Sequence, residues 1–179
     1  MKRISIFVVS LAMAFIFTAA AFAETVNLAP AAVAVESFGA SDVERPYDDV
    51  LIEQRVRGSN PPSTEWEFKP DAYKGHIDGL RYGPLYTNYY FSGVDTEIYV
   101  RSDLDYDYAN QSGALYDIVC YDKSTNQEVT RYEAISPGEN KTIKFYNLDS
   151  SKYYYFGWVK TKNNTISGDI YVHNTNWLY

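Results

Sequence analysis

The sequence predicts an all-β fold, an antiparallel β-sandwich of jelly-roll or immunoglobulin-like type with about eight or nine strands in a single domain. From about residue 50, short runs of β-branched and aromatic residues recur every 8 to 13 residues, with turn residues between them. Inside several runs, apolar and polar residues alternate, which is typical of strands with one buried face. No segment shows a convincing helical period.

The predicted strands follow one another along most of the chain. They cover 64–68, 73–81, 85–91 and 96–101 in the first half, and 114–121, 128–132, 141–146, 153–161 and 166–173 in the second.

Alternation is clearest over 141–146, where Ile143 and Phe145 share one face. Groups of Asp, Asn, Ser, Gly and Pro separate these runs and provide turn chemistry. The aromatic run over 154–158 predicts a central strand covered on both faces, as two packed sheets would provide.

The N-terminus has the pattern of a secretory signal peptide over residues 1–23. Lys2 and Arg3 precede a predominantly apolar stretch, and Ala21-Phe22-Ala23 matches the small-residue cleavage pattern. The apolar stretch is just long enough to span a bilayer, so an uncleaved anchor is the alternative. No positive cluster follows it as a stop signal, which favours cleavage and a secreted, extracytoplasmic protein.

Three segments follow from this interpretation: the cleaved signal peptide, a lead over 24–46 and a β-sandwich domain over 47–179. The lead is rich in Ala and Val without a clear period, so we expect a flexible tether with room for a short edge strand. No later stretch is apolar enough to cross a membrane, so the mature chain is expected to lack a transmembrane segment.

Charge and cysteine content restrict the classes of partner. The formal charge of −7 becomes more negative once Lys2 and Arg3 are removed, which argues against nucleic acid as a partner. Cys120 is the only cysteine, so no internal disulfide can form. Its position in an apolar run predicts a buried thiol, with intermolecular pairing as the alternative.

Residues with catalytic chemistry are sparse, and we predict no catalytic residues and no enzyme. Neither His76 nor His173 belongs to a recognised catalytic or metal motif, and both fall on the predicted solvent side of their strands. Glu65 and Glu67 are the nearest candidates for a glycosidase-like pair, and an exposed edge strand explains them equally well. A small glycoside hydrolase is therefore the second alternative.

Asp103, Asp105 and Asp107 stand at alternate positions, as in the opening of a calcium-binding loop. The EF-hand pattern fails afterwards, because Tyr108 occupies the glycine position and Ala114 the glutamate position. An irregular Ca²⁺ site with these three carboxylates is one interpretation, and an ordinary acidic surface loop is the other. No other cofactor is expected.

The chain contains 18 tyrosines, and four of them define the predicted ligand-binding residues. Tyr99, Tyr121, Tyr146 and Tyr171 project from the face opposite the aliphatic residues of their strands. Exposed tyrosine rings stack on sugars or fit a partner's pockets. Cross-strand packing that only stabilises a sheet is the competing interpretation.

The resulting hypothesis is a secreted, non-catalytic binding module that recognises an extracellular carbohydrate or cell-envelope polymer through exposed tyrosines. A polysaccharide or a surface protein is the expected partner. The first alternative is an extracellular structural or protein–protein interaction module without a small ligand, which would use an edge strand or the tyrosines.

Overall fold

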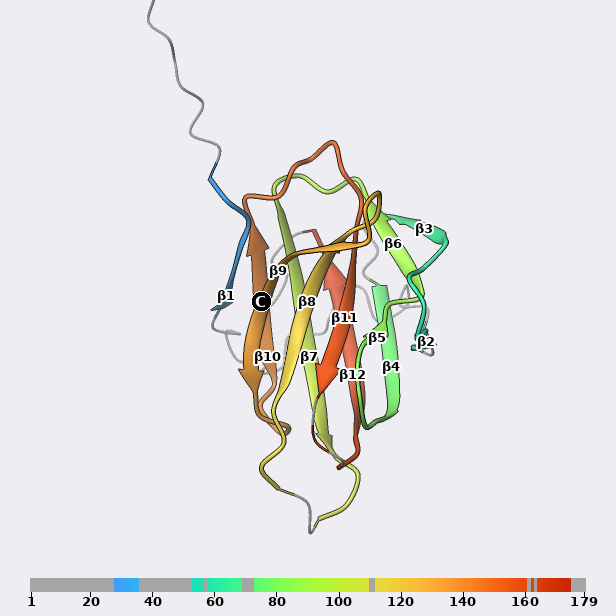
Figure 1. The fold of residues 1–179 in the computed structure, drawn as a ribbon, viewed down its shortest axis with the longest axis vertical. Coiled ribbons are helices and arrows are strands. Elements are labelled where there is room, and N and C mark those ends of the chain that lie inside the picture. Colours follow the sequence, from blue (N-terminus) through green and yellow to red (C-terminus); the bar gives the residue numbers. More distant parts are fainter. Residues whose placement is uncertain are drawn as a thin grey trace, which may run out of the picture.

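The described part of the protein consists of β-strands and connecting loops. The computed structural model describes residues 28–35, 53–56 (backbone only), 58–68, 73–109, 112–160, 162 and 164–174. These residues form twelve strands in two six-stranded sheets and contain no helix (Figure 1). In this part of the chain, no helix therefore has the length and apolarity to cross a bilayer.

The first sheet combines strands from both ends of the chain. Its order is β1 (Ala31–Val35), β10 (Lys141–Tyr146), β7 (Glu97–Tyr106), β12 (Ile166–His173), β4 (Tyr73–Leu80) and β2 (Glu53–Val56). Every pair is antiparallel except β2 with β4, which is parallel.

The second sheet is built around β11. Its order is β3 (Thr64–Glu67), β6 (Tyr89–Ser92), β11 (Tyr154–Lys160), β8 (Tyr116–Asp122) and β9 (Gln127–Ile135), and β5 (Leu85–Tyr86) also pairs with β11. The edge pair β3 with β6 is parallel, and the other pairs are antiparallel.

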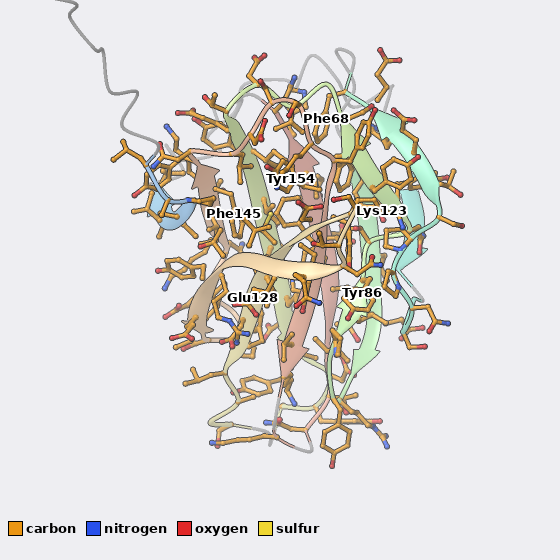
Figure 2. All side chains as sticks on the ribbon, turned by 45° about the horizontal axis from the view of Figure 1, so that its top comes forward. Phe68, Tyr86, Lys123, Glu128, Phe145 and Tyr154 are labelled. Carbon is orange, nitrogen blue, oxygen red and sulfur yellow. The ribbon has the colours of Figure 1, made fainter. Side chains whose placement is uncertain are left out.

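The core lies between the two sheets and is rich in aromatic rings. Phe68, Phe145 and Tyr154 belong to it (Figure 2), and the ring of Phe145 lies 5.1 Å from that of Phe156. Trp158 is fully buried, and Trp66 packs against the core from the edge. Each large apolar side chain buried in this way contributes about 1.5–3 kcal/mol.

A buried serine connects the two sheets by hydrogen bonds. Ser102 of β7 is fully buried, and its hydroxyl oxygen lies 3.0 Å from the hydroxyl of Tyr116 and 3.3 Å from the indole nitrogen of Trp158. Both partners belong to the second sheet, and the hydrogen bonds satisfy the Tyr116 hydroxyl and the Trp158 indole N–H inside an apolar core. The contact therefore helps set how the sheets lie on one another.

The predicted sandwich is confirmed, and the strands over 141–146 and 166–173 have the predicted bounds. The difference is in the number of strands, because the described residues alone form twelve instead of the predicted eight or nine. The predicted strand over 85–91 is two strands, because the buried Thr87 separates β5 from β6. Its backbone N–H donates to the carbonyl of Phe156 at 2.8 Å, and its hydroxyl donates to the carbonyl of Tyr89 at 2.9 Å.

Near the N-terminus, the predicted signal peptide and most of the predicted lead lie outside the described residues. Within the range interpreted as a lead, Ala31–Val35 forms the edge strand β1. The strand β1 is thus the kind of short edge strand for which the lead left room, whereas the short strand β2 was not predicted.

The β8–β9 turn is held by Asp122, which is 4% exposed. Its carboxylate accepts hydrogen bonds from the backbone N–H and hydroxyl of Ser124 at 2.8 and 2.5 Å, and it pairs with Lys152 at 2.8 Å. Burial alone would raise the pKa of Asp122, but the hydrogen bonds from Lys152 and Ser124 outweigh it and lower the pKa to about 2. The turn therefore depends on an ionised carboxylate.

We predict that Asp122 makes the fold sensitive to acid. Its pKa is lower in the folded than in the unfolded chain, so its stabilisation is complete above about pH 4 and is lost as the pH falls toward 2. Over that range, the free energy of unfolding of the native chain should fall by about 1–2 kcal/mol more than that of Asp122→Asn. Urea unfolding at several pH values measures this difference. The exposed Asp107→Asn is the control, and equal acid losses in Asp122→Asn and the native chain would refute the assignment.

Candidate functional site

A group of tyrosines covers the outer face of the second sheet. Tyr121 of β8 stands opposite Tyr155 of β11, and their rings are stacked with centroids 5.1 Å apart and planes at 11°. The ring of Tyr86 meets both of them edge-on, at 5.4 Å in each case. We use the name tyrosine surface for Tyr86, Tyr90, Tyr121, Tyr153 and Tyr155.

Gly157 explains how Tyr86 reaches its two neighbours. Gly157 follows Tyr155 by two positions on β11, so it lies on the same face of the sheet. A Cβ atom at this position would lie 2.9 Å from the Tyr86 ring and 3.1 Å from the Tyr121 ring. The space that a side chain would fill is therefore filled by the two rings, an arrangement that compensates for a glycine inside a strand.

Tyr90 and Tyr153 extend the tyrosine surface toward β6. Tyr154 pairs with Phe91 in antiparallel register, which places Tyr90 beside Tyr155 in the next position. The rings of Tyr90 and Tyr153 meet edge-on at 5.7 Å, and the ammonium group of Lys123 lies 5.7 Å from the Tyr90 centroid. A row of tyrosines thus crosses β6, β11 and β8. Tyr86, Lys123 and Glu128 mark this side of the molecule in Figure 2.

Burial within the tyrosine surface is graded. Tyr155 is 1% exposed although it lies on an outer face, whereas Tyr153 is 48% exposed and Tyr86 and Tyr121 are half-buried. Burial, with Tyr86 nearby, raises the pKa of Tyr155 to about 12, and burial also raises the pKa of Tyr121. The hydroxyls of Tyr121 and Tyr155 are therefore neutral at physiological pH. They can donate or accept hydrogen bonds but do not act as phenolate nucleophiles or bases.

The structure does not bring the four predicted ligand-binding tyrosines together. Tyr121 belongs to the second sheet, but Tyr99, Tyr146 and Tyr171 lie on β7, β10 and β12 of the first sheet. All four are half-buried. The prediction that each projects from the outer face of its strand agrees with the alternation of burial, but the sandwich separates Tyr121 from the other three.

Cations lie over the rings of the first-sheet tyrosines. The ammonium group of Lys144 is 5.8 Å from the Tyr99 centroid and 6.0 Å from that of Tyr146. Lys74 and Arg101 approach the Tyr171 centroid to 5.7 and 5.8 Å. These distances fall in the range of cation–π contacts.

The same cations also form ion pairs. Lys144 pairs with Glu97, which accepts a hydrogen bond from the Tyr99 hydroxyl at 2.8 Å. The hydrogen bond from Lys144 lowers the pKa of Glu97 most, and the hydrogen bond from Tyr99 and the charge of Lys144 lower it further. The first-sheet tyrosines are thus part of a network of charged side chains.

The two histidines have different surroundings. His76 is half-buried, and its Nδ1 lies 2.7 Å from a carboxylate oxygen of Asp169, which also pairs with Lys74 at 3.3 Å. The expectation that His173 faces solvent is wrong, because its side chain is 8% exposed and lies beside the ring of Phe68 at 6.0 Å. Strand parity placed His173 on an outer face, but it could not show that Phe68 covers the end of β12.

The three aspartates of the candidate calcium site do not lie in one loop. Asp103 and Asp105 belong to β7, and Asp107 follows in the turn. Asp103 forms an ion pair with Arg101 at 2.8 Å, and Asp105 accepts a hydrogen bond from the backbone N–H of Tyr106 at 2.7 Å. Among the described residues, no group of three or more His, Cys, Asp or Glu side chains is arranged to hold a metal ion. Calcium binding here stays a prediction.

The other candidate residues have simple positions. Glu65 and Glu67 are exposed on the edge strand β3. Cys120 is free and fully buried, as predicted, and burial raises the pKa of its thiol well above the usual value. A thiol in this state is poorly reactive.

Sequence reasoning missed four members of the tyrosine surface: Tyr86, Tyr90, Tyr153 and Tyr155. A signal for Tyr155 was present, since it shares the parity of Gly157 and alternates with Phe156 and Trp158. Aromatic rings on both faces of one strand imply that the outer face is also covered. Tyr86 carried no such signal, because its role depends on the contact across β11.

The fold and this surface together define a two-sheet β-sandwich with a tyrosine cluster on one outer face. Comparisons of the chain with protein-family models, with curated proteins and with solved structures gave no match. The function must therefore be argued from the surface itself.

We predict that Gly157→Ala disrupts the tyrosine surface. The new Cβ would displace the Tyr86 and Tyr121 rings, so the free energy of unfolding should fall by about 1–3 kcal/mol. In the Tyr86→Ala background the same change should cost clearly less, because the closest ring is gone and alanine loses less backbone entropy than glycine. Urea unfolding of the four chains gives this double-mutant cycle. An equal cost in both backgrounds would show that the position of the Tyr86 ring does not depend on the missing side chain at Gly157.

Proposed function

We propose that this chain is a non-catalytic binding module, exported from the cell, that recognises an extracellular carbohydrate or cell-envelope polymer through the tyrosine surface. The observation that supports it most is the ordered cluster of Tyr86, Tyr121 and Tyr155 on a solvent side of the second sheet. Export is inferred from the N-terminal sequence pattern.

The order of the rings before binding favours recognition. Each ring in this cluster is held by contacts with the other two, and the hydroxyl of Tyr155 lies 3.3 Å from the side-chain oxygen of Asn126. A ligand that stacks on Tyr86 or Tyr121 therefore meets side chains that have already lost most of their rotamer freedom. Sugar rings offer C–H groups for stacking and hydroxyls for hydrogen bonds, which suits tyrosine.

The second sheet suits this role better than the first. Within the described residues, Lys123 lies over Tyr90, but no lysine or arginine lies over the rings of Tyr86 and Tyr121. On the first sheet, Lys74, Arg101 and Lys144 lie over the tyrosines. A ligand at the first sheet would have to compete with these cations for the ring faces. Of the tyrosines proposed from the sequence, Tyr121 is therefore the one that we retain.

Retention on insoluble polysaccharides tests the proposal. We expect the native chain to be retained by at least one of cellulose, chitin, xylan or isolated cell wall. Tyr121→Ala and Tyr86→Ala should each weaken retention by roughly 2- to 10-fold, because each removes a stacking ring. Depletion of protein from solution over a range of polymer concentrations measures the affinity.

Variants on the opposite sheet provide the matched control. Tyr146→Ala and Tyr171→Ala also remove a half-buried tyrosine from a sheet's outer face, and they should leave retention unchanged. Thermal melting shows that each variant is folded at the assay temperature. If the native chain is retained by none of the four polymers, or if only the first-sheet variants reduce retention, the proposal is wrong.

A further inference from the structure

The strand β1 is an edge strand of the first sheet and has small side chains. It contains only alanine and valine, it pairs with β10 along a single edge, and it also touches β9 (Figure 1). Val33 is 44% exposed, Ala34 is exposed, and Ala32 is the member that packs against the core. Separation of β1 from the rest of the domain would therefore expose little apolar surface.

The chain between β1 and β2 is longer than the fold requires. The two strands occupy opposite edges of the first sheet, five strand spacings apart, which is about 24 Å. Seventeen residues separate Val35 from Glu53, and a segment of that length can reach up to about 60 Å. The connection is therefore long enough for β1 to reach a neighbouring molecule.

We infer that β1 can pair with β10 of a second copy of this chain, so that two molecules exchange N-terminal strands. The edge of β10 presents the same hydrogen-bonding groups to β1 of either copy, and each copy recovers in the exchanged dimer the contacts that it gives up. The long connection lets β1 reach β10 of either copy without strain. Because it also closes easily within one chain, the exchange is expected at high protein concentration. This inference is independent of the proposed ligand.

Cysteine cross-linking between two variants tests the exchange. Val33 of β1 faces Lys144 of β10 in the register, and directly opposed residues have Cβ atoms about 5 Å apart. Val33→Cys and Lys144→Cys chains are unfolded together, refolded together at high concentration, and treated with a short bismaleimide reagent. When β1 of a Val33→Cys chain lies on β10 of a Lys144→Cys chain, the reagent links the two chains covalently. Intact-mass spectrometry identifies this heterodimer. We expect the heterodimer to be the main cross-linked product.

The control mixes Val33→Cys with Thr125→Cys, because Thr125 is exposed at the β8–β9 turn and lies outside the β1–β10 register. The buried Cys120 is present in every chain and gives a common background. As a measurement without substitutions, light scattering of the native chain should show a dimer fraction that rises with the concentration at refolding. A heterodimer yield no higher than the control, together with a native chain that stays monomeric at every concentration, would overturn the inference.

Discussion

The structure depends on β11, the strand whose two faces are both covered. Its inward residues, Tyr154, Phe156 and Trp158, fill the space between the sheets, while Tyr155 on the outward side is equally buried. A central strand of this kind needs cover on its solvent side, since an apolar outer face would otherwise remain in water. The cover comes from Tyr86 and Tyr121, which approach because Gly157 leaves them space. The same choice of residues that completes the second sheet therefore also creates its aromatic surface.

Much of the fold follows from local sequence patterns. Alternation over 141–146 and 166–173 gave the bounds of β10 and β12, because the apolar residues that alternate there, such as Ile143 and Phe145 of β10, are buried between the sheets. The strands β1 and β2 are different, because β1 contains only alanine and valine and β2 reads Glu-Gln-Arg-Val. Neither shows the alternation of apolar and polar residues that indicates a strand. The division of 85–91 depends on hydrogen bonds between Thr87 and Phe156, residues 69 positions apart. Contacts of this range set details that no local period contains.

The candidate site shows the same limit in another form. Alternation indicates which side chains of one strand share a face, but it does not indicate which strands share a sheet. Tyr99, Tyr146 and Tyr171 were grouped with Tyr121 on parity, and the strand order then places β8 in the other sheet. Tyr86 was beyond prediction, because its neighbours depend on β5 pairing with β11. The sequence indicated that outward tyrosines are candidates for binding, but which tyrosines lie together depends on the strand order.

The two outer faces use tyrosine in different ways, and the difference is electrostatic. On the first sheet, Lys74, Arg101 and Lys144 lie over tyrosine rings and also form ion pairs with carboxylates. Binding of a neutral ring there would require separation of these charged groups, and that cost would reduce any gain from stacking. On the second sheet, Lys123 lies over Tyr90, but Tyr86 and Tyr121 are ordered mainly by contact with other rings. Among the described residues no cation lies over these two rings, so a ligand can stack on them at lower cost. A recognition surface needs ordered side chains whose free faces can be occupied at low cost, and the second sheet meets this requirement better because its order comes from aromatic packing.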